Sequence, residues 1–135
     1  MEPSGIEAPE ANASDTGTLG IVNAVFAAWA NGIRDHRPEE VASLFTEDAI
    51  FQGLDRSHGI GRPVVTAYYE KQPAGLRADY RILEHRRLSV DVLVAYADVD
   101  FSFLDGRVIP VHLTVVLQRA GGSWLISHYH VSKIQ

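Results

Sequence analysis

The chain of 135 residues contains no cysteine and carries a formal net charge of −5 at pH 7. Its length suits one domain with a substantial core, and the lack of cysteine excludes disulfides and thiolate chemistry. Because nucleic acids and anionic membranes repel acidic proteins, we expect neither as a partner. No apolar run approaches the roughly 20 residues that span a bilayer, and the first residues lack a signal-peptide pattern. We therefore expect a cytoplasmic protein.

The N-terminal residues predict a flexible arm followed by an amphipathic helix. Residues 1–16 are mostly Pro, Glu, Ala, Ser, Asp and Gly, which bury too little apolar surface to offset the entropy lost on ordering. From Thr18 onward, apolar residues recur at three- and four-residue steps, as in a helix with one buried face. These residues are Leu19, Val22, Val25, Phe26, Trp29 and Ile33. We assign residues 1–16 to the arm and 17–135 to a single domain.

Two shorter helices and a short strand are predicted next. Pro38 suits the first turn of one helix, and a further helix over residues 62–72 is ended by Pro73. Between these helices, residues 48–52 predict a short strand. Residues 54–60 after that strand are polar and predict a loop.

Beyond Gly75 the apolar pattern changes to a period of two, which is typical of strands. Four strands are expected, over residues 76–87, 90–104, 108–119 and 123–133. The Asp-Gly pair at residues 105–106 and the Gly-Gly pair at 121–122 are good hairpin turns. Three helices followed by a mostly antiparallel sheet predict an α+β fold, in which a curved sheet wraps the helices and can enclose a pocket.

This order of elements resembles the nuclear transport factor 2-like superfamily, whose fold is a cone-shaped, cystatin-like roll of curved antiparallel sheet packed on three N-terminal helices. The resemblance is carried by residues 44–51 (LFTEDAIF), by residues 59–62 (GIGR) ahead of Tyr68 and Tyr69, and by residues 122–126 (GSWLI). Within the superfamily the chain is most similar to the SnoaL-like group of secondary metabolism, including small proteins associated with enediyne clusters. Its end, residues 127–132 (SHYHVS), also resembles the association domain of calmodulin-dependent kinase II, which assembles subunits.

The resemblance does not extend to the catalytic groups of the ketosteroid isomerases. In that branch an aspartate general base follows the first strand, where this chain has Gly53. A tyrosine on the first helix of that branch aligns with Phe26. Glycine cannot abstract a proton and phenylalanine cannot donate to an oxyanion, so steroid-type isomerisation by those groups is excluded.

Three side chains that could do chemistry share one face of the second long strand, because side chains alternate along a strand. They are Tyr96, Asp98 and Asp100. The resemblance implies that this face points into the cone, opposite an aromatic wall. The spacing alone allows the alternative that it is the solvent-exposed polar side of a half-buried strand. Carboxylates in an apolar cavity have raised pKa values that suit acid–base work near neutrality.

We therefore expect a catalytic set and a ligand-binding set. The candidate catalytic residues are Asp98 or Asp100 as the base, with Tyr96 and His58 among the hydrogen-bond donors. The candidate ligand-binding residues, which offer aromatic walls and some hydroxyl groups, are Phe26, Trp29, Phe51, Tyr68 and Tyr129. For His58, in the 54–60 loop, the alternative is a solvated residue without a catalytic role.

The histidines near the end of the chain allow several interpretations. His128 and His130 share a face of the last strand, and His112 can lie on the adjacent strand, so the three could form a metal site. The resemblance instead implies that Tyr129 faces the pocket and that the two histidines lie outside, unless a bulge reverses the alternation. We favour interface or structural histidines over a catalytic base, and expect no metal.

The leading functional hypothesis is a cone that binds a hydrophobic, oxygenated small molecule, with or without cofactor-independent acid–base chemistry of cyclase, isomerase or hydrolase type in secondary metabolism. The alternatives are a non-catalytic carrier that shields a metabolite and an oligomerisation module. No cofactor is expected. A homodimer is expected in each case, because the third and fourth long strands are apolar on both faces and the helices cover only one.

Overall fold

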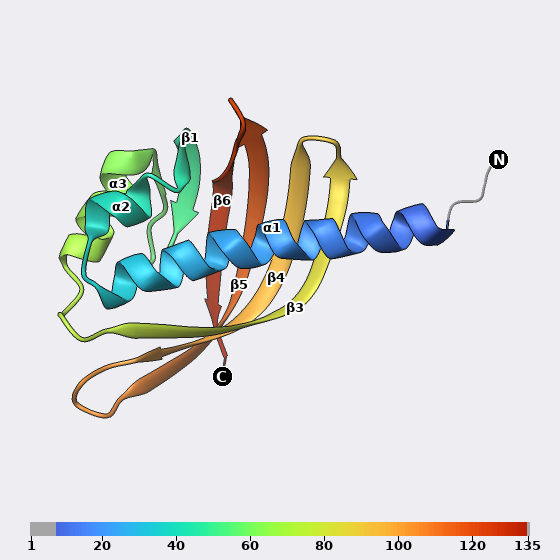
Figure 1. Ribbon diagram of the computed structural model, residues 1–135. Coiled ribbons are helices and arrows are strands. Elements are labelled where there is room, and N and C mark those ends of the chain that lie inside the picture. The colour runs from blue at the N-terminus through green and yellow to red at the C-terminus, as the bar shows by residue number, and fades with distance from the viewer. Residues whose placement is uncertain (1–7, 135) are drawn as a thin grey trace.

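The computed structural model describes residues 8–134 of the chain. The helices are α1 (Ala8–Arg34), α2 (Pro38–Ala42) and α3 (Arg62–Glu70). The strands are β1 (Phe45–Gln52), β2 (Gly59–Ile60), β3 (Arg77–Ser89), β4 (Val92–Ser102), β5 (Val108–Ala120) and β6 (Ser123–Lys133). The helices lie on one face of a single curved sheet, which α1 crosses diagonally while α2 and α3 sit beside β1 (Figure 1). This arrangement confirms the predicted α+β class and the cone-shaped architecture.

The six strands follow the order β2-β1-β6-β5-β4-β3 across the sheet. The pairs β3–β4, β4–β5 and β5–β6 are antiparallel and join neighbours in the chain. The pair β1–β6 is parallel, so the sheet is mixed rather than purely antiparallel. As a result, the last strand lies between the first strand and the hairpins, and the first and last strands of the chain are neighbours in the sheet.

The first helix begins earlier than the sequence predicts. It starts at Ala8 rather than near Thr18, so residues 8–16 of the predicted arm are helical. Alanine, which occurs three times among residues 8–16, has the highest helix propensity and can extend a helix past the surface on which it packs. The N-terminal turns of α1 do extend beyond the sheet in Figure 1. Residues 1–7 of the arm lie outside the described residues.

The core lies between α1 and the concave face of the sheet. The predicted stripe is confirmed for Val22, Phe26, Trp29 and Ile33, all of which are buried, whereas Leu19 is exposed. On β4, burial alternates strictly, and the buried side chains are Leu93, Ala95, Ala97, Val99 and Phe101. Alternating apolar residues therefore turn toward the helices, as expected for a sheet covered on one face. Within residues 8–134, no helix is long and apolar enough to cross a membrane.

The strand boundaries differ from the prediction mainly around β1. This strand begins at Phe45, three residues before the predicted start, because Phe45 is buried and pairs with Ile126 of β6. The predicted 54–60 loop also contains a short strand, β2, in which Ile60 pairs with Ile50 of β1. The predicted bounds of the four long strands agree with the structure to within two residues.

Two hydrogen bonds fix the start of α3 against β1. The backbone N–H of Gly61 donates to the carbonyl oxygen of Ala49 at 2.8 Å, and Arg62 Nε donates to the carbonyl oxygen of Phe45, also at 2.8 Å. Gly61 has a positive φ of 96°, which a glycine adopts without strain. These bonds matter for the interior because α3 carries Tyr68 and Tyr69.

We expect Arg62→Met to lower the free energy of unfolding by about 1.5–3 kcal/mol, because it removes a charged donor from a partly buried carbonyl. Urea denaturation would measure this loss. Arg77→Met, at an exposed arginine on β3, is the matched control and should change stability by less than about 0.5 kcal/mol. Equal effects of the two substitutions would contradict the role assigned to Arg62.

Candidate functional site

The candidate ligand-binding residues come together as one aromatic cluster inside the cone. The rings of Phe51 and Tyr129 stack with centroids 4.7 Å apart, and Tyr68 meets Phe51 edge-on at 5.1 Å. Trp29 contacts Phe26 edge-on at 5.9 Å, and also lies 6.1 Å from the Tyr129 ring. Phe26, Trp29, Phe51 and Tyr129 are buried, and Tyr68 is half-buried. The predicted aromatic wall therefore exists, and its residues come from α1, β1, α3 and β6.

Three polar groups lie at the centre of this cluster. Trp29 Nε1–H donates to the hydroxyl oxygen of Tyr69 at 3.2 Å, and the hydroxyls of Tyr69 and Tyr129 are hydrogen-bonded at 3.1 Å. All three side chains are at most 4% exposed. We call Trp29, Tyr69 and Tyr129 the polar trio.

The polar trio has one more donor than it has hydrogen bonds. The indole N–H and the two phenolic O–H groups are three donors, but only two bonds connect them. If Tyr69 donates to Tyr129, the Tyr129 proton lacks an acceptor among the described residues; if Tyr129 donates, the Tyr69 proton does. Either way, one buried hydroxyl proton has no acceptor among the described residues, and a donor left unpaired in a protein interior costs about 1–3 kcal/mol.

The trio can donate hydrogen bonds but cannot act as a base near neutral pH. Burial raises the pKa of Tyr69 and raises that of Tyr129 well above its usual value, because a phenolate would be desolvated in this apolar surrounding. Both phenols therefore stay neutral. Among the described residues, no fully buried side chain is a carboxylate, an imidazole or an amine.

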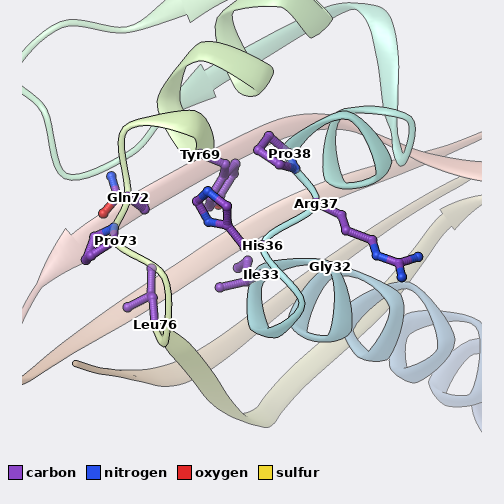
Figure 2. A pocket seen from close by; sticks show the side chains of 9 residues that line it. All are labelled: Gly32, Ile33, His36, Arg37, Pro38, Tyr69, Gln72, Pro73 and Leu76. Carbon is purple, nitrogen blue, oxygen red and sulfur yellow. The ribbon is translucent and has the colours of Figure 1, made fainter. Parts of the chain in front are cut away.

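The aromatic side chains fill the cone, so the open cavity expected from the sequence is absent from the described interior. A deep hollow between Trp29, Leu113 and Tyr129 has no space for a water molecule. Two further hollows of about 10 Å³ each lie on either side of Tyr69, Gln72 and Leu76, which line both. We call the one that includes Leu54 and Phe101 the mouth hollow. The other, at the C-terminal end of α1, is the helix-end hollow (Figure 2).

The ring of Tyr68 packs closely against Gly53. A Cβ atom added at Gly53 would lie 2.7 Å from two ring carbons of Tyr68 and 2.9 Å from its hydroxyl oxygen. That hydroxyl accepts a hydrogen bond from the backbone N–H of Leu54 at 3.2 Å. A side chain at residue 53 would therefore displace the Tyr68 ring.

The structure places Tyr96, Asp98 and Asp100 on the outer face of the sheet, away from the helices, so their predicted position inside the cone is wrong. They alternate with the fully buried Ala97 and Val99. The physical reason is burial: turning the apolar set inward removes apolar surface from water, whereas the opposite register would bury two carboxylates without partners. His58, the fourth candidate catalytic residue, is exposed in the loop before β2.

On the outer face, two of these residues form a cluster with His112 of β5. Asp98 Oδ1 lies 2.8 Å from His112 Nδ1, and Asp98 Oδ2 accepts a hydrogen bond from Arg81 at 3.2 Å. The Tyr96 ring stacks on the imidazole with centroids 5.4 Å apart. The cluster is partly exposed, with 39% of the His112 side chain and 23% of the Asp98 side chain accessible. It is an ion-paired patch on a sheet surface rather than the wall of a cavity.

His128 and His130 also lie on the outer face, as the resemblance implies, with ring centroids 6.4 Å apart. An irregularity near Ser127 lets both Ile126 and Tyr129 point inward although they are three residues apart. This is the bulge that sequence alternation alone could not place. Within the part of the chain that the structure describes, no group of three or more histidine, aspartate or glutamate side chains could hold a metal ion.

Sequence reasoning missed Tyr69 as a site residue, although it named both of its neighbours in the trio. Tyr68 and Tyr69 are adjacent on α3, and periodicity places both on its apolar side without separating their roles. A buried indole N–H needs a hydrogen-bond acceptor, and this requirement of Trp29 could have indicated Tyr69, whose hydroxyl oxygen accepts that bond.

The hydrogen bonds of the polar trio predict that its two tyrosines contribute differently to the free energy of unfolding. Tyr69→Phe removes both hydrogen bonds and leaves two buried donors without acceptors, whereas Tyr129→Phe removes one bond and leaves one. We therefore expect Tyr69→Phe to lower the free energy of unfolding by about 1–3 kcal/mol more than Tyr129→Phe does. Urea denaturation of the two variants measures the difference. A larger loss for Tyr129→Phe would contradict the geometry of the trio.

Several solved structures share this fold. The chain is 14% identical to a protein from Novosphingobium aromaticivorans described as a scytalone dehydratase, with a TM-score of 0.79 over 92% of this chain and 89% of that one. A ketosteroid isomerase-like protein from Erwinia carotovora is 21% identical, with a TM-score of 0.71 and coverage of 87% and 96%. A protein from Xanthomonas campestris described as a calcium/calmodulin-dependent protein kinase II association domain is also 21% identical, with a TM-score of 0.72 and coverage of 84% and 85%.

At these identities the likeness is one of fold alone. No curated protein matches the chain. The family model of the SnoaL-like domain does match, over residues 22–135, which includes all three members of the polar trio and every strand. The chain therefore belongs to the SnoaL-like domain family.

Proposed function

We propose that this protein binds a small, mostly apolar molecule inside the cone through a hydrogen bond to an oxygen of that molecule. The observation that carries the proposal is the surplus donor of the polar trio. A carbonyl or ether oxygen of a ligand would accept the proton that the described residues leave unsatisfied. Because both phenols stay neutral, the trio favours an acceptor oxygen over a cationic group.

The walls around the trio suit a flat ligand. Aromatic rings meet it from several sides, and such rings favour stacked or edge-on contacts with another ring system. Ring compounds of polyketide type combine a flat apolar body with a carbonyl group and meet these requirements. Entry requires the filled interior to open. Tyr69, Gln72 and Leu76 line both hollows, so displacement of Gln72 and Leu76 would join the two and expose the Tyr69 side of the trio.

The proposal is one of binding rather than acid–base catalysis. Asp98 and Asp100 lie on the opposite face of the sheet and cannot reach an interior ligand, and the described interior contains no other carboxylate or imidazole. This favours the carrier hypothesis over the catalytic one. The dehydratase and isomerase-like descriptions of two structural neighbours are in line with a small-molecule site in this fold.

A pair of matched probes tests the proposal: 2-acetylnaphthalene, which has a ketone, and 2-isopropenylnaphthalene, in which a CH₂ group replaces the oxygen. In the triple variant Trp29→Phe/Tyr69→Phe/Tyr129→Phe, which removes all three donors of the polar trio, we expect the ketone to bind about 5- to 30-fold more weakly, since about 1–2 kcal/mol of hydrogen bonding is lost. The hydrocarbon should bind at least as well as before. An NMR titration that follows the backbone N–H signals of β6 would measure both affinities.

Tyr80→Phe is the control, because Tyr80 donates its hydroxyl to Asn23 near the surface and not to the trio. It should leave the ratio of the two affinities unchanged. If wild-type protein binds neither probe, or if the triple variant weakens both equally, the proposed function is wrong. A folded triple variant, shown by circular dichroism, is required for the comparison.

A second observation favours self-association through the outer face of the sheet. A cross-strand row there places Ile50, His128, Val116 and Val94 side by side. Ile50 is 40% exposed, and none of the helices covers this face (Figure 1). Apolar rows of this kind favour contact with a second surface. We infer a homodimer in which two copies pair these faces, in line with the association-domain description of one structural neighbour.

Val116→Lys should convert this dimer to monomer, because it places two lysines against apolar side chains at the shared face. Sedimentation velocity measures the change in mass. Asn31→Lys introduces the same charge at an exposed position of α1, on the opposite side of the sheet, and should leave the dimer intact. Wild-type protein that sediments as a monomer, or a dimer that survives Val116→Lys, would overturn the assignment.

A further inference from the structure

His36 holds an unusual backbone conformation at the end of α1. Its φ is 52°, and no other non-glycine residue in the described range has a positive φ. The backbone N–H of His36 donates to Ile33 at 3.1 Å, and that of Arg37 donates to Gly32 at 2.9 Å. These two bonds form the helix-terminating motif whose left-handed residue is most often glycine. A side chain at this position strains the backbone, because its Cβ approaches the following carbonyl.

No bond within the described residues explains why a histidine occupies this position. The neighbours of His36 are already paired, Asp35 with Arg34 at 3.1 Å and Arg37 with Glu40 at 3.0 Å. The imidazole of His36 itself makes no hydrogen bond or ion pair with a described group, and the residue is exposed. Its side chain therefore adds no bond that offsets the backbone strain. A strained residue of this kind points to a role outside the fold.

The position of the His36 imidazole indicates what its role outside the fold is. His36 lines the helix-end hollow together with Tyr69, the central member of the polar trio, and with Gln72 (Figure 2). In Figure 2 the imidazole lies over this hollow, whereas the guanidinium of Arg37 points away from it. The lining of the hollow includes the imidazole and the Gln72 amide but no carboxylate; Gln72 Nε2 donates one hydrogen to the carbonyl oxygen of Tyr68 at 3.4 Å and has a second N–H. It is therefore suited to receive an acceptor-rich, anionic group.

We propose that His36 and Gln72 form a carboxylate-binding subsite at the helix-end hollow. This inference rests on the proposed function and extends it. The ligand would have an oxygen near the trio and, beyond its apolar ring body, a carboxylate that accepts hydrogen bonds from the imidazole and the amide. His36 is then a specificity-determining residue that the chain retains in place of the glycine its backbone conformation favours.

The substitution His36→Gly tests this, because its structural and binding effects have opposite signs. Glycine relieves the backbone strain, so the unfolding equilibrium constant should fall about fivefold and the melting temperature should rise. Affinity for 6-acetyl-2-naphthoate, which carries ketone and carboxylate at opposite ends, should fall about tenfold. Affinity for 2-acetylnaphthalene, which lacks the carboxylate, should change by less than twofold. His36→Asn, which tolerates the same φ and offers an amide donor, should recover part of the lost affinity.

Three results would overturn the inference. If His36→Gly is less stable than the wild type, the histidine serves the fold. If His36→Gly binds the naphthoate as well as the wild type does, while Trp29→Phe/Tyr69→Phe/Tyr129→Phe still weakens ketone binding, the subsite is wrong and the proposed function stands. If wild-type protein binds neither probe, the proposed function is wrong and the subsite with it.

Discussion

Two hydrogen bonds through the centre of an apolar core determine how this fold is assembled. The two bonds connect three elements that are distant in the sequence, because Trp29 lies on α1, Tyr69 on α3 and Tyr129 on β6. The indole N–H finds an acceptor only if α3 presents Tyr69, and this requires the contacts of Gly61 and Arg62 with β1. The position of both helices on the sheet thus depends on satisfying these buried groups.

The same hydrogen bonds affect both the stability of the closed interior and its capacity to bind a ligand. The aromatic rings exclude water and stabilise the closed interior by burying a large apolar area. One hydroxyl proton has no acceptor among the described residues, and a closed core that leaves such a donor unpaired is less stable than a fully satisfied one. Sites that bind ligands often retain such local deficits, and here the deficit is confined to one point in a core that is otherwise well packed.

The fold and the aromatic interior could be predicted because they follow from local patterns. Strand alternation gave the bounds of the long strands, and the stripe on α1 identified Trp29 and Phe26 as interior residues. On β4 the same alternation, with apolar Ala97 and Val99 on either side of Asp98, indicates a carboxylate that points outward. The superfamily resemblance implies the opposite face for Asp98, and that face is the wrong one. Burial of apolar surface decided the register.

The remaining parts of the site could not be predicted because they depend on contacts between distant segments. The bulge near Ser127 shifts the alternation of β6 by one residue, and only pairing with β5 reveals it. The positive φ of His36 follows from the way α1 ends against α2, in a position where glycine would have been expected. The closeness of Gly53 to Tyr68 is likewise visible only once α3 lies on β1.

The parallel pairing of β1 with β6 has a consequence for biosynthesis. During translation, β1 leaves the ribosome long before β6, its neighbour in the sheet. Ile50 of β1 cannot pair with His128 until β6 has been synthesised. Until then β1, β2 and α3 lack their main support, while the hairpins from β3 to β5 can already form from nearby residues. Distant pairings of this kind slow folding and expose strand edges to other chains. The nascent protein is therefore most vulnerable to aggregation just before its final strand emerges.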